Sequence, residues 1–561
     1  MPVDVAEDTL DLVIELLETG PPTPASYPYP SLNRTGRTDS RTFQSVVLEN
    51  PYLRATVVPD LGGRILRLED KRTGADVFPF GPNLPLSNGG ARGVQCPSGL
   101  QVVTGFEHRL NSMGHVALIP DFGGEEEEPS AVWWGEVCGN GISLNCRYSI
   151  PADQAYLEIE VRAFNRSLEP VSYNGGLSFG LEGEWLKLPS GWLWRGADLE
   201  LLAEPVDTWM QHAEAGAIHR FDRIRYLAPR QLDSWKVRLY PTGIGEHLRE
   251  ANTQVAVGWS RQELALQASQ TVMGSKLVVR LDDGSTLEMP VDLYPEHIER
   301  IPLDSVSSGI AELVMLSANR EEIVRASNLP SPSPCERAPG EAKPRSLKPE
   351  ENLQLATFEP GQRHHAHLLL GYRQLAQKNY FEAAREFEQT LLFNAEDHLA
   401  WWIKAVAERL AGQDEGDRPE LLNAHFLAPL EPVLRAESYL SSPSQAKEKS
   451  AVLSPLEETP EAFIEVACLL LEAGLLEEVS KWIDEALRHS DLPMLRYLLA
   501  YAYLKGSRMQ VQAGEQVQLA IRQEPEPPYP WRAVEREALK TLAEKFPADG
   551  SLRRLNDLVK E

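Results

Sequence analysis

The hydrophobic period of this chain changes once, from strand-like to helical, and that change divides the chain into two unlike parts. Between about residues 42 and 319, short runs alternate apolar with polar residues and are separated by turn sequences such as Asn-Pro, Gly-Gly and Asp-Asp-Gly. After residue 360, apolar residues recur with the spacing of one helix face. So many short strands favour stacked antiparallel sheets, and we expect a multidomain protein in which β-sandwiches precede helices.

Composition divides the two parts further. Residues 326–358 are dense in proline, serine and charge, cannot form a core and are expected to be an extended linker. We expect 1–40 to be an N-terminal segment and 41–234 a large β-sandwich region. Residues 235–325 are expected to form a small β-sandwich, either separate or part of the same β unit, and residues 359–561 helical repeats.

The helical part contains one close match to the 34-residue tetratricopeptide pattern. Weaker copies follow near residues 462 and 495, which predicts a short α-solenoid. Such arrays bind proteins, self-associate or pack against a neighbouring domain, and we expect this one to contribute little or nothing to bond chemistry. The matching residues of the first copy are Leu370, Gly371, Tyr372, Tyr380, Ala383, Ala384, Phe387 and Leu391.

Charge and cysteine usage exclude several classes of function. The formal net charge of −27 disfavours a nucleic acid or a membrane as partner, because phosphate binding needs clustered Lys and Arg. Five cysteines without a CxxC pair argue against a disulfide framework or a thiolate zinc site. The first residues are acidic where a signal peptide is basic, so we expect a cytoplasmic protein. Neither a phosphate loop nor an HExxH helix occurs, and we expect no metal and no organic cofactor.

Acidic and imidazole side chains next to glycine are the first candidates for chemistry. Glu107 and His108 follow Gly105, and His115 follows Gly114. A carboxyl and an imidazole are the usual general acid and base near neutral pH, so we expect Glu107 and His115 to be catalytic and His108 to bind substrate. The alternative is a polar surface loop without a ligand.

Three further carboxylates are candidates for catalysis. Strand periodicity places Glu182 and Glu184 on one face, about 6.5 to 7 Å apart at Cα. Glu136 follows a Trp-Trp pair in another strand. Two carboxyl groups in unlike environments can divide the roles of acid and base, as in the hydrolysis of glycosidic bonds. The alternative for the Glu-Gly-Glu run is a solvated strand edge.

Tryptophan and arginine side chains are the candidates for sugar binding. Adjacent Trp133 and Trp134 point to opposite faces of a strand, so one can pack inside while the other stacks on a flat sugar face. Trp185 follows the paired carboxylates directly. Arg64 follows a Gly-Gly turn, which allows a tight reversal or the close approach of backbone or ligand. Core packing for each tryptophan, and bracing of neighbouring groups for Arg64, are the alternatives.

Three segments of the β region, YPYPSLN, LENPYLRATVVPDLGGRILRLEDKRTGADVF and GFEHRLNSMGH, resemble one bacterial family, the domain of unknown function number 5107. The late segment EPEPPYPWRAVEREALKTLAEKFPAD is similar to the repeat region of that family. The resemblance implies a galactose-mutarotase-like β-supersandwich joined to tetratricopeptide repeats, and a concave face that binds sugar. It directs attention to Arg64, Glu107 and His115 as site residues.

Three functions are compatible with these patterns, and all three predict a carbohydrate ligand. The first is a glycoside hydrolase that uses two of the four candidate glutamates. The second is an aldose epimerase in which a histidine and a glutamate open and reclose the sugar ring. The third is a non-catalytic sugar sensor or scaffold that presents the repeats to a protein partner. We expect Glu107, His115 and at least one of Glu182 and Glu184 to line a single pocket with one or more of the tryptophans.

Overall fold

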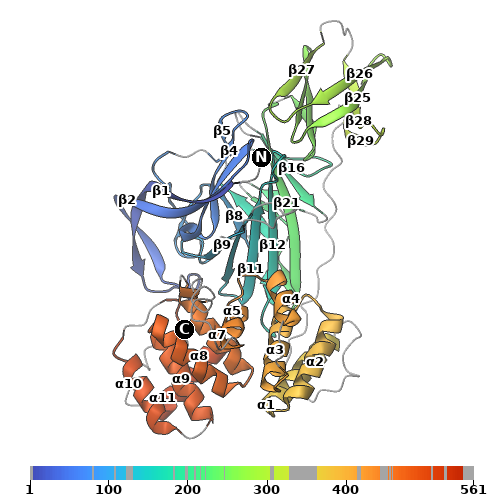
Figure 1. The fold of residues 1–561 in the computed structure, drawn as a ribbon. Helices are drawn as coiled ribbons and strands as arrows, with labels where there is room; N and C mark the ends of the chain where they lie inside the picture. The colour runs from blue at the N-terminus through green and yellow to red at the C-terminus, as the bar shows by residue number, and fades with distance from the viewer. Residues whose placement is uncertain are drawn as a thin grey trace.

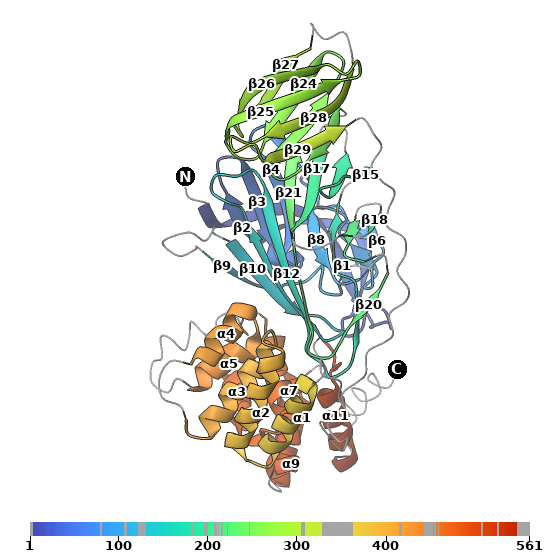
Figure 2. The ribbon, with the colours of Figure 1, turned by 90° about the vertical axis from the view of Figure 1, so that its right-hand side faces the viewer.

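The chain folds into three parts that follow one another in sequence: a large β-sandwich, a small β-sandwich and an array of helices (Figure 1). The expected fold class is therefore confirmed. The small sandwich lies at one end of the large one and the helices lie at the other (Figures 1 and 2). The computed structural model describes residues 4–78, 81–105, 109–121, 131–180, 184–195, 200–206, 210, 212–214, 217–221, 223–245, 247–303, 309–327, 363–413, 418–441, 453, 456–457, 459–506, 509–523 and 527–546.

The large sandwich consists of two antiparallel sheets. Strand β12 (Leu157–Asn165) shows why they pack: Leu157, Ile159 and Val161 alternate along it and are fully buried in the core between the sheets. In spatial order, the first sheet contains β1 (Asp4–Gly20), β2 (Ser31–Glu49), β3 (Leu53–Val58), β4 (Arg64–Asp70), β8 (Leu100–Val103), β14 (Gly176–Phe179), β19 (Ala217–His219) and β18 (His212–Glu214), with β5 (Ala75–Asp76) beside β4. The second contains β15 (Glu184–Lys187), β16 (Trp192–Arg195), β17 (Glu200–Val206), β21 (Leu232–Thr242), β12 (Leu157–Asn165), β11 (Ile142–Ser149), β10 (Ala131–Val137) and β9 (Ala117–Asp121).

Short elements lie in the connections of the large sandwich. They are the 3-10 turn η1 (Pro59–Leu61) and two small strand pairs, β6 (Ser87–Asn88) with β7 (Val94–Gln95) and β13 (Val171–Tyr173) with β20 (Arg225–Leu227).

Two of the expected domain boundaries differ from the structure. Strand β1 pairs with β2 from Asp4 opposite Glu49 to Gly20 opposite Ser31, so the first 40 residues belong to the first sheet instead of forming a separate segment. Strand β21 crosses the boundary expected after residue 234, because it continues to Thr242 within the second sheet. A strand pattern shows that a segment is extended but does not show which sheet it joins.

The small sandwich packs two four-stranded sheets around its own core of valine, leucine and methionine side chains. The linker expected over residues 326–358 lies almost entirely outside the described residues, after the last strand of this sandwich. One sheet is β22 (Leu248–Ala251), β23 (Val255–Trp259), β24 (Glu263–Ala268) and β27 (Ile298–Pro302). The other is β26 (Thr286–Leu293), β25 (Val272–Leu281), β28 (Ile310–Leu316) and β29 (Glu322–Ser327).

Two buried carboxyl groups lie near the junction of the two sandwiches. Glu200 on β17 accepts a hydrogen bond from the backbone of Gly245 at 2.9 Å, and burial raises its pKa to about 7. Glu250 on β22 accepts one from Ser190 at 3.1 Å, and burial raises its pKa to about 7 as well. Because both pKa values exceed those of the unfolded chain, both groups stabilise the fold at low pH and lose that contribution as the pH rises from about 4.5 through 7.

The unfolding free energy of the parent protein is therefore expected to fall between pH 5 and pH 8 by on the order of 2–3 kcal/mol for each of these carboxyls. The double variant Glu200→Gln/Glu250→Gln should show a much flatter profile in urea titrations across that range, because neither amide titrates. The exposed Glu322→Gln is the control and should keep the parental slope. An unchanged slope in the double variant would contradict the assignment.

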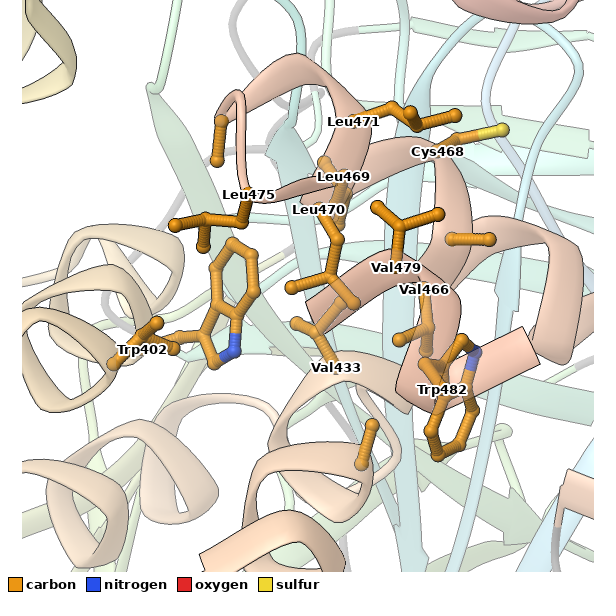
Figure 3. Packing of buried hydrophobic residues seen from close by; sticks show 14 of the residues in the cluster. Trp402, Val433, Val466, Cys468, Leu469, Leu470, Leu471, Leu475, Val479 and Trp482 are labelled. Atoms are coloured by element: carbon orange, nitrogen blue, oxygen red, sulfur yellow. The ribbon is translucent and has the colours of Figure 1, made fainter. Parts of the chain in front are cut away.

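The helices pack as successive antiparallel pairs around a continuous core, part of which Figure 3 shows. Trp402 and Trp482 are fully buried in it, and the small residue Gly371 lets the ring of Phe387 approach the first helix. The helices are α1 (Arg363–Ala376), α2 (Tyr380–Phe393), α3 (His398–Leu410), α4 (Pro419–Leu427), α5 (Pro432–Ser441), α7 (Glu461–Glu472), α8 (Leu476–His489), α9 (Pro493–Gly506), α10 (Gln510–Ala520) and α11 (Ala533–Lys545).

The helical array and the large sandwich share buried contacts. Phe164 of β12 belongs to the helical core, and its ring centroid lies 4.3 Å from that of His398. Arg166, just after β12, pairs with Glu431 at 2.9 Å and also with Glu465 of α7. All three charged side chains are almost fully buried. The array therefore packs on the sandwich as a fixed part of the fold.

In the described part of the chain, every helix is too short or too polar to span a lipid bilayer. The cysteines that the structure describes, Cys96, Cys138, Cys146 and Cys468, are free thiols.

Candidate active site

Two adjoining cavities lie on either side of Glu136. The smaller one lies between the large sandwich and the helices, and the larger one is lined by the large sandwich alone. Their volumes are about 70 Å³ and 380 Å³, and both are lined by Tyr29, Asn111, Glu136 and Val137. We call the two together the interdomain pocket; the larger one falls within the roughly 300–1,000 Å³ typical of small-molecule sites. Side chains from both sides of the interface line the smaller cavity, among them His115, Glu136, Asn145, Arg435, Glu461 and Trp531.

The Gly-Gly turn after η1 packs against the loop that carries Asn111 and His115, two residues that line the pocket. Gly62 and Gly63 have φ angles of 72° and 70°. A Cβ on Gly62 would lie 2.9 Å from the backbone of Ser112, and one on Gly63 would lie 2.6 Å from the ring of Trp134. The turn therefore serves a close approach of backbone to protein, one of the two roles expected for it.

Replacing Gly63 by alanine should destabilise the protein more than replacing Gly36, which has the same backbone conformation. Gly36 has a φ of 71° with no atom within 4 Å of its added Cβ, so Gly36→Ala isolates the conformational cost, about 1–2 kcal/mol. Gly63→Ala should cost about 1–3 kcal/mol more, because the ring of Trp134 must move. Chemical denaturation of both variants measures the difference, and equal losses would show that the contact with Trp134 is not tight.

Glu136 is held at the pocket by a buried arginine. Its Oε1 lies 2.6 Å from Nη1 of Arg109, and the two side chains are 7 % and 1 % exposed. Arg109 is fixed in turn by the carbonyl oxygens of Val102 and Gly62 and by the ring of Trp134, whose centroid lies 4.4 Å away. The second oxygen of Glu136, Oε2, is buried and has no hydrogen-bond partner among the described residues. Glu136 therefore combines a compensated charge with one buried acceptor atom that no described residue uses.

Glu461, in the first turn of α7, is a further carboxylate of the pocket, which Glu465 of the same helix also lines. Burial raises the pKa of Glu461 and the negative charge of Glu136 raises it further, against the opposing effect of Arg532 and His115. Tyr29 lines the same cavity as both carboxylates. Burial raises the pKa of its hydroxyl, and the charges of Glu461 and Glu136 raise it further. The two glutamates thus come from different domains, interact electrostatically and occupy unlike environments.

His115 lies beside these groups and is oriented by an aspartate. Its Nδ1 is 2.8 Å from Oδ1 of Asp60, and the contact with His115 holds the pKa of Asp60 below its usual range. Asn111 donates a hydrogen bond to the backbone oxygen of His115 at 2.8 Å, which closes the loop. Imidazole and carboxylates at one cavity form a constellation able to transfer protons.

The structure brings two of the predicted site residues, Glu136 and His115, into this pocket. Glu107, His108 and Glu182 lie outside the described residues, as does the side chain of Glu184.

The other predicted residues lie elsewhere, for reasons of packing. Arg64 is 2 % exposed and donates to Ser98 and Gln101, which corrects its expected place at the ligand. Trp134 is fully buried in the sandwich core. Trp133, on the opposite face of β10, contacts Arg162, and Trp185 packs on Phe179 at 5.2 Å between centroids. Among the described residues, none of these three tryptophans lines the interdomain pocket.

The helical side of the site was not expected from the sequence. Trp531 precedes α11, and its neighbour Arg532 pairs with Glu465 and Glu535. The hydroxyl of Tyr27 donates to the carbonyl of Pro530, which ties this segment to the large sandwich. Residues of α7 and of the segment before α11 form one side of the smaller cavity. The aromatic, proline-rich sequence around Trp531 is the signal that could have indicated it.

No group of three or more His, Cys, Asp or Glu side chains suited to a metal ion occurs within the described ranges.

A family model described as domain of unknown function DUF5107 matches residues 22–173. The chain contains a DUF5107 domain. This match confirms the resemblance seen in the sequence, and the matched range includes Asp60, Arg109, His115 and Glu136. The DUF5107 domain thus supplies the sandwich side of the interdomain pocket.

Among solved structures, a TPR-domain containing protein from Parabacteroides distasonis ATCC 8503 is similar at 14 % identity and a TM-score of 0.29, over 94 % of this chain and 96 % of that one. Galactose 1-epimerase from Lactobacillus acidophilus NCFM is similar at 9 % identity and a TM-score of 0.23, over 37 % and 96 %. A galactose mutarotase-like protein from Clostridium acetobutylicum is similar at 11 % identity and a TM-score of 0.24, over 36 % and 96 %. Scores this low support no conclusion about function.

Proposed function

We propose that this protein is a carbohydrate-active enzyme that hydrolyses a glycosidic bond with Glu136 and Glu461. The supporting observation is that these two carboxyl groups, one from β10 and one from α7, line a single cavity in unlike environments. Hydrolysis of glycosides commonly needs one carboxylic acid and one carboxylate beside the same bond. Aromatic surface from Tyr29 and Trp531 supplies the apolar contact that a sugar ring requires.

The environments suggest which glutamate takes which role. Burial raises the pKa of Glu461, so its carboxyl is the proton donor to the departing oxygen. Arg109 compensates the charge of Glu136, whose Oε2 lacks a protein partner among the described residues and can face the anomeric carbon or an attacking water. His115, held by Asp60, and Asn111 are placed to bind sugar hydroxyls.

A second candidate function is aldose epimerisation, and the His115–Asp60 contact is the observation that favours it. An imidazole fixed at 2.8 Å from a carboxylate has a defined orientation, and with Glu136 it could move the protons that open and reclose a sugar ring. This reaction needs no departing group and therefore no role for Glu461.

The two functions separate in one experiment. The full-length protein is incubated with a panel of aryl glycosides, oligosaccharides and free aldoses, and the anomeric protons are followed by NMR. Hydrolysis predicts new reducing-end signals, whereas epimerisation predicts faster exchange between free anomers with every glycoside intact. If neither occurs while sugars bind, the chain is a sensor and the proposal is wrong.

A further inference from the structure

Arg435, on α5, differs from the other arginines that line the interdomain pocket. Arg109 pairs with Glu136, and Arg532 pairs with Glu465. Arg435 makes no ion pair with any carboxylate in the described part of the chain, and its pKa is lowered by burial alone. A positive charge in a poorly solvated wall without an acidic partner is costly, and a negatively charged ligand would relieve that cost.

The contacts of Arg435 with the protein use only part of its hydrogen-bonding capacity. Nη2 donates to the carbonyl of Pro429 at 3.2 Å, beyond the end of α4, and Nε is buried without a partner among the described residues. A guanidinium has five N–H donors in a planar fork, so one carbonyl does not account for the group. The charge of Arg435 also acts on His425. Burial lowers the pKa of His425 to about 4, and Arg435 contributes a smaller part of that decrease.

The turn that presents Arg435 is fixed against the large sandwich. Asn145 of β11 accepts a hydrogen bond from the backbone of Leu430 at 3.3 Å, and Glu431 is held by Arg166 and Ser143. Because α5 begins directly after this turn, Arg435 is held beside the cavity that Glu136 and Glu461 also line. An anionic group on a sugar bound there would meet a preorganised cation.

We infer that the substrate of this site is a glycoside bearing one carboxylate, of the uronic-acid type, and that Arg435 binds this carboxylate. The inference rests on the proposed function, which it makes more specific. Among the described lining residues, Arg435 is the one arginine without a carboxylate partner. One unpaired guanidinium matches the single charge of a carboxylate better than the charge of about −1.5 to −2 on a phosphate monoester. The net charge of −27 opposes approach of a long polyanion, so a short acidic glycoside is expected.

The test compares matched pairs of 4-nitrophenyl glycosides: glucoside with glucuronide, and galactoside with galacturonide. For the parent enzyme we expect kcat/KM to favour the uronide of a pair by about 10²-fold, on the scale of a charge-assisted contact. In Arg435→Gln this preference should fall by about 10²-fold, mostly through the uronide, and Arg435→Lys should recover only part of it because lysine lacks the planar fork. Arg249→Gln removes one exposed positive charge from the small sandwich and is the control, with the parental preference expected.

Several outcomes would overturn the inference. Cleavage of neutral glycosides alone, or an equal loss on both members of a pair in Arg435→Gln, would leave the proposed function standing but assign Arg435 a structural role. Preference for a 6-phosphorylated glycoside would replace the carboxylate by a phosphate. If no glycoside is cleaved, the proposed function fails, and calorimetric binding of methyl glucuronide and methyl glucoside decides the inference separately: selective binding of the uronide that Arg435→Gln abolishes supports it, and any other binding result contradicts it.

Discussion

Replacing Glu461 by glutamine is expected to lower kcat for glycoside cleavage by about 10²- to 10⁴-fold, or roughly 3–5 kcal/mol of barrier. Glutamine keeps the shape of the side chain but cannot donate a proton to the departing oxygen. A general acid must be protonated to act, and burial raises the pKa of Glu461. The parent should therefore lose activity as the pH rises through that raised pKa. The basic limb of the pH profile should therefore disappear in the variant.

Controls separate this role from a general effect of lost charge. Glu477, on α8, is 81 % exposed and pairs with Lys378 at the surface, so Glu477→Gln should keep the parental kcat. Glu136→Gln should also lose activity, but it leaves Arg109 buried without its partner and should be less stable, so Glu461→Gln is the cleaner test. An unchanged kcat and pH profile in Glu461→Gln would show that Glu461 is not the acid.

Replacing Arg166 by methionine is expected to reduce the unfolding free energy by about 3–5 kcal/mol. The change leaves two buried carboxylates, Glu431 and Glu465, without the guanidinium that joins them at the interface. Burial raises the pKa of Glu431, but the charge of Arg166 and the contact with His398 outweigh it and hold the pKa at about 2. Without Arg166, that carboxyl must stay charged at a large cost or take up a proton.

Chemical denaturation of Arg166→Met at pH 7 measures this loss. Arg325→Met is the matched control: Arg325 also joins two glutamates, Glu312 and Glu322, but its side chain is 50 % exposed, so its removal should cost at most about 1 kcal/mol. Because α7 carries both Glu465 and Glu461, the folded fraction of Arg166→Met should also bind sugar more weakly. Equal losses in the two variants would mean that the buried network does not hold the array on the sandwich.

Much of the fold follows from local sequence patterns. The change from alternating to helical periodicity predicted which residues form sheets and which form helices, since both patterns depend on near neighbours. The Gly-Gly turn was correctly expected to permit a close approach, although the pattern could not show that Trp134 is what approaches. The role of β1 was missed because strand pairing is settled by partners far along the chain, here β2 and the first sheet.

The site was predictable only on the sandwich side. His115 was identified because an imidazole next to glycine suggests chemistry, and Glu136 was identified as a carboxylate close to a Trp-Trp pair; both line the pocket. Glu461 was missed because an acid in the first turn of a helix is ordinary for helix capping and charge, and nothing local marks it as facing a sheet. Its position depends on buried contacts such as Arg166–Glu465, which join residues 299 apart in sequence. Packing across a domain interface leaves no short-range pattern in either partner.

The central claim is that a sugar binds between Glu136 and Glu461, and the crystal structure of Glu461→Gln with a bound oligosaccharide tests it most directly. The variant should bind substrate without cleaving it, because the cavity keeps its shape. The account predicts an anomeric carbon in the interdomain pocket, with Oε2 of Glu136 and the amide of residue 461 both within about 3–3.5 Å of the reacting atoms. A sugar bound away from β10 and α7, with water filling the interdomain pocket, would contradict it.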